Sequence, residues 1–577
     1  MPGKTPLAAL LGMIVVGGLG LACDIPDGKW KKPEARDVAP ALPRKVPPHI
    51  NNTVAQYAVL QGSAGMPVQG WGIVIGLGRN GSSEIPAALK DFLIKQLSVQ
   101  GFGSAKEGLG DISPERVLAD KDTAVVQVTA SIPGGATVGS RFDVYVQSLP
   151  NDQTRSLEGG RLLMTDLHLP VGGPEMAGRN VTTIARAEGE VFVNPFLDPS
   201  KLEHQPQYRQ GRVLGGGLVT ENRVLQLQLR QASHSTAQNI DLRIRERWSG
   251  RNPTARAKND TTVNLFVPEE YQKDYAHFLK LVMRLPIYFG NQQYFEHAQE
   301  VARAMEAPGA PYEDLAMVWE AMGQQAIPAV RKVYVSRLPK AAFCAAQVGM
   351  RLDDGPASQI ILDAAMNPSS PFRLQAIEEL GRHPSALAGT QLGDLLDDPN
   401  ALVRMAAYRA ILRRGGHPAV NTIDVGGRFF VDVVASRGPR AICVTQSLQP
   451  RITVFGGFDL PISTPVFLTT PGGLVTIDGK KGGEGIRVFR KTPRTGALSD
   501  PFSVPAKVVP LILILGRAAK LDPQKNVMGL GLTYGQVVST LYHLCQAGDI
   551  KAEFVPEQPS NRATEEGPPI MYRPDTP

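Results

Sequence analysis

One long stretch of this chain carries a different pattern from the sequence on either side of it. Residues 312–418 have apolar residues at helical spacing throughout, without the alternation that marks strands. Before and after it, short apolar runs alternate with glycine and proline turns, which is typical of strands. The sequence therefore predicts an α+β, multi-domain protein, in which a β-rich scaffold is interrupted by an all-α insertion.

The helical stretch contains two similar units that are offset by 31 residues. Such a repeat resembles HEAT-type arrays, which stack helices into a shared core and present a surface to partners. A bundle that only packs explains the pattern equally well. We expect an autonomous block whose ends lie close together, so that its deletion leaves a folded protein. In each unit a turn with a proline precedes an arginine and an alanine: Asn367-Pro368, Arg373 and Ala376, then Asp398-Pro399, Arg404 and Ala407.

The bulk composition is that of an ordinary globular protein with several domains. The chain has 577 residues, of which 42% are hydrophobic and 20% charged. Its net charge of +7 is spread along the sequence, whereas nucleic-acid binding requires a clustered basic patch. We therefore predict no nucleic-acid partner, and the mild positive charge suits an anionic surface such as an envelope polymer.

The first residues resemble an export signal. Lys4 precedes an apolar run, Pro6–Ala22, that is too short and glycine-rich for a confident membrane span. The run ends at Ala22-Cys23, which resembles a bacterial lipobox in which Cys23 is acylated. Gly20 replaces the usual leucine of that motif, so ordinary cleavage and an uncleaved anchor stay open. Residues 24–48 are rich in proline and charge, which predicts a tether.

The remaining cysteines do not predict a metal site. Cys344, Cys443 and Cys545 are widely spaced and form no CxxC pair. At most one internal disulfide can form among three cysteines, and Cys443 with Cys545 is the pair to test in an oxidising compartment. Cys344 lies in an alanine-rich helical stretch and is expected to be a small buried side chain.

A glycine-rich motif invites a nucleotide-binding interpretation, which its surroundings disfavour. Residues 76–81 (GLGRNG) fit GxGxxG between a strand and a helix. The acidic residue expected about twenty positions later is missing, and Ser82-Ser83-Glu84 lengthens the turn. We interpret it as an interface loop. The sequence holds neither HExxH nor GxSxG, so we predict no enzyme, no metal and no cofactor.

Several blocks resemble the flagellar P-ring protein family. They are residues 70–77 (GWGIVIGL), 129–144 (TASIP to DV), and 157–167 (LEGGRLLMTDL), the most specific. Residues 211–213 and 533–555 follow the family's order. Residues 312–418 have no counterpart in an ordinary member, and 419–520 match weakly. The motif residues that we expect to be structural are Gly70, Gly72, Gly76, Gly139, Asp143, Gly159, Gly160, Leu163, Met164 and Thr165.

The resemblance implies a non-enzymatic ring subunit in the periplasm, at the flagellar basal body. Its implied partners are further copies of itself, the flagellar rod, outer ring proteins and peptidoglycan, with a lipid anchor in a membrane. The alternative is an envelope lipoprotein that binds a protein partner through helical repeats and forms no flagellar ring. We expect seven segments: 1–23 signal, 24–48 tether, 49–311 P-ring-like, 312–418 helical insertion, 419–520 β-rich, 521–556 C-terminal helix and strand of the P-ring-like scaffold, and 557–577 disordered tail.

Overall fold

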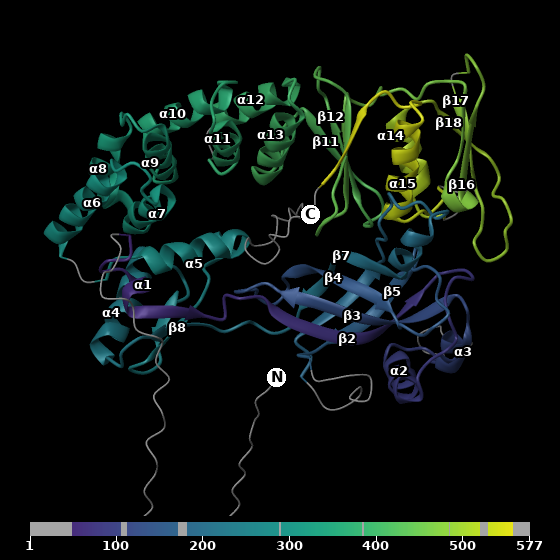
Figure 1. The fold of residues 1–577 in the computed structure, drawn as a ribbon, viewed down its shortest axis with the longest axis horizontal. Helices are drawn as coiled ribbons and strands as arrows, with labels where there is room; N and C mark the ends of the chain where they lie inside the picture. The colour runs from purple at the N-terminus through teal and green to yellow at the C-terminus, as the bar shows by residue number, and fades with distance from the viewer. Residues whose placement is uncertain are drawn as a thin grey trace, which may run out of the picture. The chain divides into compact units, whose positions relative to one another are not determined.

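The computed structural model confirms the α+β class, since β-rich regions and a helical block follow one another along the chain (Figure 1). The predicted signal and tether lie outside the described residues, as does the tail beyond residue 557. The structure describes residues 49–104, 112–170, 182–287, 290–383, 386–483, 485–519 and 529–557.

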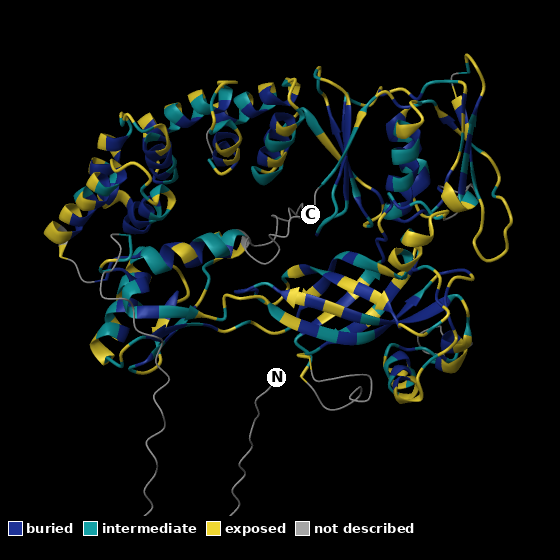
Figure 2. Ribbon diagram, viewed as in Figure 1, coloured by how far each residue is buried: buried dark blue, intermediate teal, exposed yellow. Residues whose placement is uncertain are grey.

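Six strands close into a barrel in the order β2-β3-β4-β7-β6-β5. Successive side chains of a strand point to opposite faces, and buried and exposed residues alternate along these strands (Figure 2). The inward side chains, such as Val126, Val128 and Val144, form one apolar core. Helices α2 (Ala87–Val99) and α3 (Pro114–Ala119) pack against residues of β2 and β3. Its strands are β2 (Met66–Ile75), β3 (Thr123–Ile132), β4 (Arg141–Ser148), β5 (Arg161–Leu167), β6 (Ala185–Glu190) and β7 (Gln210–Val219).

A second, four-stranded sheet has the order β1-β8-β10-β9. Leu225, Leu227 and Leu229 of β8 are buried against helices, as their alternation with polar residues predicted. The elements of this region are α1 (Val54–Tyr57), β1 (Ala58–Gln61), β8 (Leu225–Leu229), α4 (His234–Arg247), β9 (Ala255–Ala257), β10 (Thr262–Leu265) and α5 (Tyr275–Arg284).

The helical block follows. Its first helix, α6, precedes the predicted boundary at 312 and shares a core with α7 to α9. The two repeat units are adjacent, because Arg373 pairs with Asp398 at 2.5 Å, and Ala376 and Ala407 are fully buried in one core. The helices are α6 (Asn291–Met305), α7 (Tyr312–Met322), α8 (Ile327–Val333), α9 (Pro339–Arg351), α10 (Gly355–Met366), α11 (Arg373–Leu380), α12 (Ala386–Asp394) and α13 (Ala401–Arg413).

The C-terminal region contains two sheets whose apolar side chains share one core with helices α14 and α15. One sheet has the order β11-β12-β14-β13-β19 and the other β15-β16-β17-β18. The predicted capping box is present, since the Thr533 N–H donates to Gln536 Oε1 at 3.0 Å. The bounds are β11 (Val420–Asp424), β12 (Phe430–Val434), β13 (Ala441–Val444), β14 (Arg451–Phe455), β15 (Val466–Thr469), β16 (Val475–Gly479), β17 (Gly485–Arg490), β18 (Phe502–Pro505), α14 (Val508–Gly516), α15 (Tyr534–Gln546) and β19 (Glu553–Pro556).

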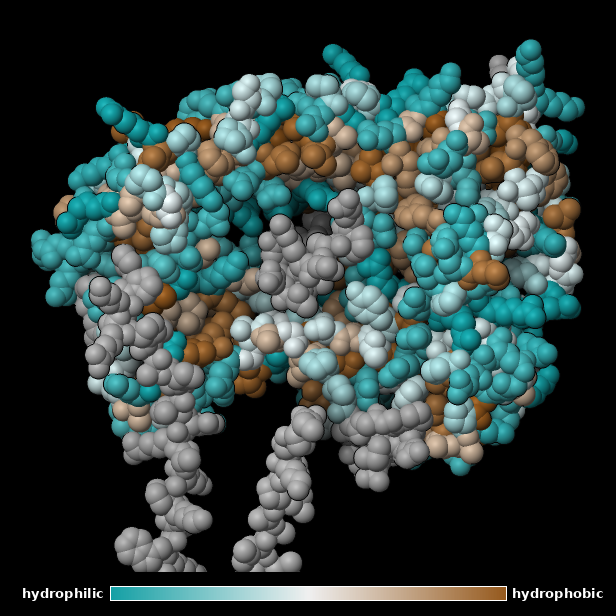
Figure 3. Space-filling model, in the orientation of Figure 1, coloured by the Kyte–Doolittle hydropathy of each residue, from teal (hydrophilic) through white to brown (hydrophobic). Residues whose placement is uncertain are grey.

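The surface drawn in Figure 3 is mostly hydrophilic, with hydrophobic residues in scattered groups. Among the residues that the structure describes, no helix combines the length and apolarity needed to cross a membrane.

Candidate structural site

The motif glycines of β2 allow the barrel to close. A Cβ atom on Gly70 would stand 2.4 Å from the Asp166 carbonyl oxygen, and one on Gly72 would stand 2.4 Å from Thr165 Oγ1. Both neighbours lie on β5, the strand that meets β2 at the seam of the barrel. Because real Cβ atoms do not approach so closely, both positions require the absence of a side chain. The two glycines and Thr165 therefore form one packing unit.

The strand β5 is irregular at the Leu163-Met164-Thr165 motif. Its register against β6 shifts between Leu162 and Thr165, which is typical of a β-bulge. The Thr165 hydroxyl donates to the Leu163 carbonyl oxygen at 2.8 Å. The Met164 carbonyl oxygen accepts a hydrogen bond from Gln100 Nε2, just past α2, at 2.6 Å. The bulge thus frees backbone groups of the motif to hold α2 against the barrel.

Glycines at the end of β2 and the start of β5 form a second close approach. Gly76 and Gly159 adopt positive φ angles of 84° and 77°, which favour glycine. A Cβ on Gly160 would stand 2.4 Å from Val74 Cγ1. A Cβ on Gly159 would stand 2.8 Å from Gln536 Nε2 of α15. These glycines are therefore packing positions.

The GxGxxG loop uses its backbone donors within the protein. The Leu77 N–H donates to the Asp122 carbonyl oxygen at 3.0 Å, and the Gly81 N–H donates to the Lys121 carbonyl oxygen at 2.9 Å. The Gly78 N–H donates to the Asp122 carboxylate. Phosphate binding by such a loop requires free N–H groups at the start of a helix, whereas α2 begins only at Ala87. The geometry favours the structural interpretation.

Asp143 joins the barrel to the C-terminal region. Its Oδ1 accepts hydrogen bonds from the backbone N–H of Gly215 at 2.7 Å and of Leu448 at 2.8 Å. Leu448 lies between β13 and β14 and has a φ of 50°. Burial raises the pKa of Asp143, although the two N–H groups oppose that rise. Gly139, four residues earlier in the same motif, has a φ of 88°, and its N–H donates to the Val219 carbonyl oxygen.

Two further contacts at this junction involve residues that the sequence did not indicate. Glu190, at the end of β6, accepts hydrogen bonds from the Arg428 guanidinium at 2.5 Å. The rings of Phe192 and Tyr534 lie 5.6 Å apart, and Phe192 belongs to the C-terminal core. No local pattern could have found these pairs, because each joins residues hundreds of positions apart.

A buried network of charges joins α5 to three helices of the block, and sequence reasoning missed it. Arg351 of α9 donates to Glu320 of α7 at 2.8 Å and to Glu379 of α11 at 2.9 Å. His277 of α5 lies 2.6 Å from Glu320. Burial alone would raise the pKa of Glu320, but Arg351 and His277 outweigh burial and lower that pKa to about 2. Arg351 is the centre of this network.

The last helix of the block, α13, forms hydrogen bonds with the C-terminal sheet that contains β12 and β14. The Tyr408 hydroxyl donates to Asp432 of β12 at 2.6 Å, and Arg451 of β14 pairs with the same carboxylate at 2.5 Å. Arg404, the second repeat arginine, lies over the Phe455 ring at 5.7 Å. The first repeat arginine instead meets the carboxylate of the next unit. The sheet thus occupies the place of a third unit.

The cysteines are free thiols wherever the structure describes them, and Cys23 lies outside that range. Cys443 is buried in the core shared by the helices and β13, while Cys545 lies against the C-terminal core. Burial raises the pKa of both thiols to about 12, which disfavours the thiolate that starts disulfide formation. The pairing of Cys443 with Cys545 stays a prediction. Cys344 is buried, as expected. Within the described ranges, no cluster of three or more His, Cys, Asp or Glu is placed to hold a metal.

Comparison with known proteins finds the family that the sequence blocks resemble. Residues 54–294 match the family model described as FlgI, flagellar P-ring protein. This match covers the barrel, the small sheet and the start of α6. The predicted resemblance at 533–555 lies outside it and stays a prediction.

Individual relatives carry the same family name. The flagellar P-ring proteins of Geobacter metallireducens, Aquifex aeolicus and Burkholderia mallei are 29%, 28% and 30% identical to this chain over 230, 246 and 241 residues. The alignments cover 38%, 41% and 39% of this chain and 56%, 61% and 58% of those relatives. A solved structure of an engineered protein, 14% identical, covers 25% of this chain and 64% of its own, and its TM-score of 0.15 supports no inference.

Proposed function

We propose that this chain is a structural subunit of the flagellar P ring, or of a closely related envelope ring, that surrounds the rod at the peptidoglycan layer. The observation that carries the proposal is the match of residues 54–294, whose motif glycines close the barrel at the β2–β5 seam. Members of this family are structural proteins and not enzymes. A ring requires two complementary faces on one protomer, and a rigid closed barrel can hold such faces in a fixed relation.

The proposed partners are further copies of this chain, the rod, outer ring proteins and peptidoglycan, in the periplasm. Negative-stain imaging of detergent-extracted envelopes tests the proposal, with an antibody against this chain as the label. Labelled rings around a rod are the expected result. A matched preparation from cells that lack the chain should show bare rods. Rings that persist without label in the deletion strain would reject the proposal.

The second candidate is an envelope protein that holds a protein partner through its helical block and forms no flagellar ring. The extent of the family match supports this second candidate, because the match ends at residue 294 and does not include helices α7 to α13. Affinity purification from the same extract separates the two candidates. This candidate requires a defined complex with another protein and no ring in the images.

Lipid anchoring at Cys23 is part of the proposal and rests on the Ala22-Cys23 sequence alone. Multiple acyl chains anchor a protein stably, whereas one chain binds a membrane only marginally. We expect Cys23→Ser to move the protein from the membrane fraction to the soluble fraction. Mass spectrometry of the mature N-terminus should find the lipid on Cys23. Unchanged membrane association of the variant would show that another feature holds the protein there.

A further inference from the structure

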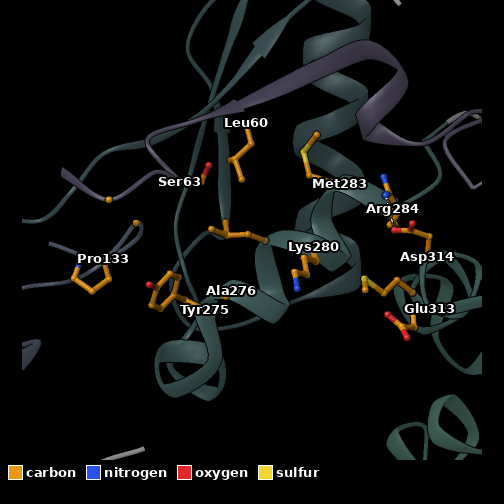
Figure 4. A pocket seen from close by; sticks show the side chains of 14 residues that line it. Leu60, Ser63, Pro133, Tyr275, Ala276, Lys280, Met283, Arg284, Glu313 and Asp314 are labelled. Atoms are coloured by element: carbon orange, nitrogen blue, oxygen red, sulfur yellow. Dashed lines mark hydrogen bonds and ion pairs between the residues drawn. The ribbon is translucent and has the colours of Figure 1, made fainter. Parts of the chain in front are cut away.

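The cavity beside α5 balances its own charges. It has a volume of about 610 Å³, and Figure 4 shows Arg284 close to Asp314 in its lining. Arg284 pairs with Asp314 at 2.7 Å, and Glu313 pairs with Lys340 at 3.0 Å. The lining therefore selects no ligand by charge. The sheet β15-β16-β17-β18 instead offers a surface whose two edges differ in chemistry.

The edge of this sheet at β15 is open. Among the described residues, β16 is the only strand that bonds to β15. The Thr470 N–H donates to the Val475 carbonyl oxygen at 2.9 Å, just past the end of β15. Because antiparallel strands bond through alternate pairs, Leu468 also bonds to β16, whereas the backbone groups of Phe467 and Thr469 point away from it. The open edge therefore presents the N–H and C=O groups of these two residues.

Proline protects the opposite edge, at β18. The Lys491 N–H donates to the Leu474 carbonyl oxygen at 2.8 Å, which fixes the alternation of bonds between β16 and β17. Carried across β17 to β18, the same alternation places the backbone groups of Ser503 on the outer edge, between Pro501 and Pro505. Proline has no N–H to donate, and natural proteins use it to keep edge strands from pairing with other chains. The sheet thus has one protected edge and one open edge.

The open strand is apolar and carries no charge. It consists of Val466–Thr469, with the sequence VFLT. The Phe467 side chain is 75% exposed, more than any other aromatic side chain among the described residues. Pro465 and Pro471 stand close beyond the two ends of the strand. An exposed apolar edge of this kind is a template for pairing with another strand.

We propose that β15 pairs with β15 of a second copy of this chain, antiparallel and about a two-fold axis at Leu468. In this register Phe467 lies opposite Thr469 of the partner subunit, and Thr469 lies opposite Phe467 of the partner subunit. The outward backbone groups of each such pair face one another, so each pair exchanges both of its N–H···O bonds. Leu468 and Leu468 of the partner subunit form the pair between them, which has no hydrogen bonds.

The strand favours a copy of itself as its partner for three reasons. Each Phe467 ring lies beside a threonine, and aromatic pairs with β-branched residues stabilise sheets. The strand has no charge, so two copies approach without repulsion. Pro465 of one copy stands opposite Pro471 of the other, which ends the pairing at both sides.

A two-fold contact of this kind involves only two copies, because each subunit uses the same surface. The protected edges at β18 then stop the combined sheet from growing further. The contact goes beyond the proposed ring and does not depend on it, since a ring requires head-to-tail contacts between other faces.

Cysteine crosslinking in the full-length protein tests the register. Directly opposite residues of a pair without hydrogen bonds have Cα atoms about 4.5 Å apart, which a disulfide can span. Leu468→Cys should therefore form a disulfide-linked dimer, and mass spectrometry should find position 468 linked to itself. Thr469→Cys is the matched control, because its two copies lie diagonally, about 7–8 Å apart.

The expected order of rates distinguishes this register from chance encounters. Leu468 is half-buried, whereas Thr469 is exposed. Random collision therefore predicts faster crosslinking at position 469, while the proposed register predicts that position 468 reacts several-fold faster. Equal rates, or the reverse order, would overturn the proposal.

Proline substitution provides a second measurement, by sedimentation velocity. Thr469→Pro removes an N–H that points away from β16, so the sheet keeps its own hydrogen bonds. It should weaken dimerisation several-fold. Ser503→Pro is the matched control on the protected edge and should leave dimerisation unchanged, with circular dichroism confirming the fold of both variants. An unmodified chain that stays monomeric, or equal dimerisation of the two variants, would reject the contact.

Imaging of the Thr469→Pro variant separates this contact from the ring. Labelled rings should persist in its envelopes, because the head-to-tail faces are unchanged. Loss of rings and dimers together would show that β15 joins ring neighbours, and the two-fold register would then be wrong. Absence of rings in the unmodified strain would reject the ring proposal alone, since the crosslink at position 468 does not require a ring.

Discussion

The barrel and the helical block bury their apolar side chains in different ways. The barrel closes on itself, and its core consists of residues from the barrel strands and the loops between them. The core of the helical block continues beyond its ends: Ala321 of α7 packs with the α5 region, and Val434, Ala441 and Phe455 of the C-terminal sheet pack with α11 and α13. A repeat array has open ends that need a cap. Here the neighbouring regions provide it.

Deletion of residues 312–418 should have the largest effect on folding and stability. The sequence predicted an autonomous block whose removal leaves a folded protein, but the shared cores change the expected result. The deletion removes Ala321 from the core of the α5 region and removes α11 and α13 from Phe455. The apolar surface that this uncovers costs about 25 cal/mol per Å². We expect a protein that aggregates or is rapidly proteolysed, with the barrel as the fragment that resists longest. A soluble, protease-resistant deletion variant would restore the autonomous model.

Replacing Arg351 should have the next largest effect. Arg351→Met leaves Glu320 with His277 and Glu379 with Arg382 as their remaining charged partners, so the loss costs up to about 3–5 kcal/mol of unfolding free energy. Thermal unfolding followed by circular dichroism should show an earlier helical transition. Lys340→Met, on the same helix, is the matched control, because the side chains of Lys340 and its partner Glu313 are 51% and 67% exposed, so the loss of this pair should matter far less. Equal shifts in both variants would contradict a special role for Arg351.

Local features were predictable from the sequence, and closure was not. The Thr533–Gln536 box, the strand that starts at Thr123 and the end of α15 near Gly548 depend on neighbouring residues, so their patterns are visible locally. The β2–β5 seam joins Val74 to Leu162, and the parallel pairing of β13 with β19 joins Cys443 to Val555. Such pairings depend on the whole fold.

The same distinction holds for the candidate site. The motif resemblance indicated Gly72, Asp143 and Thr165 as structural, but not that Asp143 binds the Leu448 N–H. The residues of the Arg351 network come from separate helices, and none belongs to a motif. An isolated arginine in a helical pattern predicts a solvated face, so the sequence held no signal for it.

Acidification should change the stability of the helical block and of the barrel in opposite directions. The folded pKa of Glu320, about 2, lies below the ordinary 4.5, so its stabilising contribution is present above pH 4.5 and is lost as pH falls toward about 2. Asp143 has a raised folded pKa, so acid relieves the cost of burying its charge.

Circular dichroism during acid titration should therefore show helix loss before strand loss. Glu320→Gln removes the titrating carboxylate and should shift the helical transition to higher pH, because even neutral conditions then lack the ion pair. Asp143→Asn should leave that transition in place. Strand loss at higher pH than helix loss would reverse the assignment of the two regions.

The smallest expected effects come from two glycine-to-alanine changes of opposite sign. In Gly72→Ala, the new methyl group would meet Thr165 Oγ1 at 2.4 Å and Leu162 Cδ1 at 3.0 Å, and overpacking of this kind costs about 1–3 kcal/mol. Gly355, at the start of α10, has no neighbour within 4 Å of the added atom and no positive φ. Gly355→Ala should therefore stabilise the helix by about 0.4–1 kcal/mol, because the unfolded chain loses conformational freedom. Denaturant titrations of both variants measure these changes. If Gly72→Ala left the free energy of unfolding unchanged, the β2–β5 seam would be able to widen. The barrel would then be less rigid than its closed, self-contained core indicates.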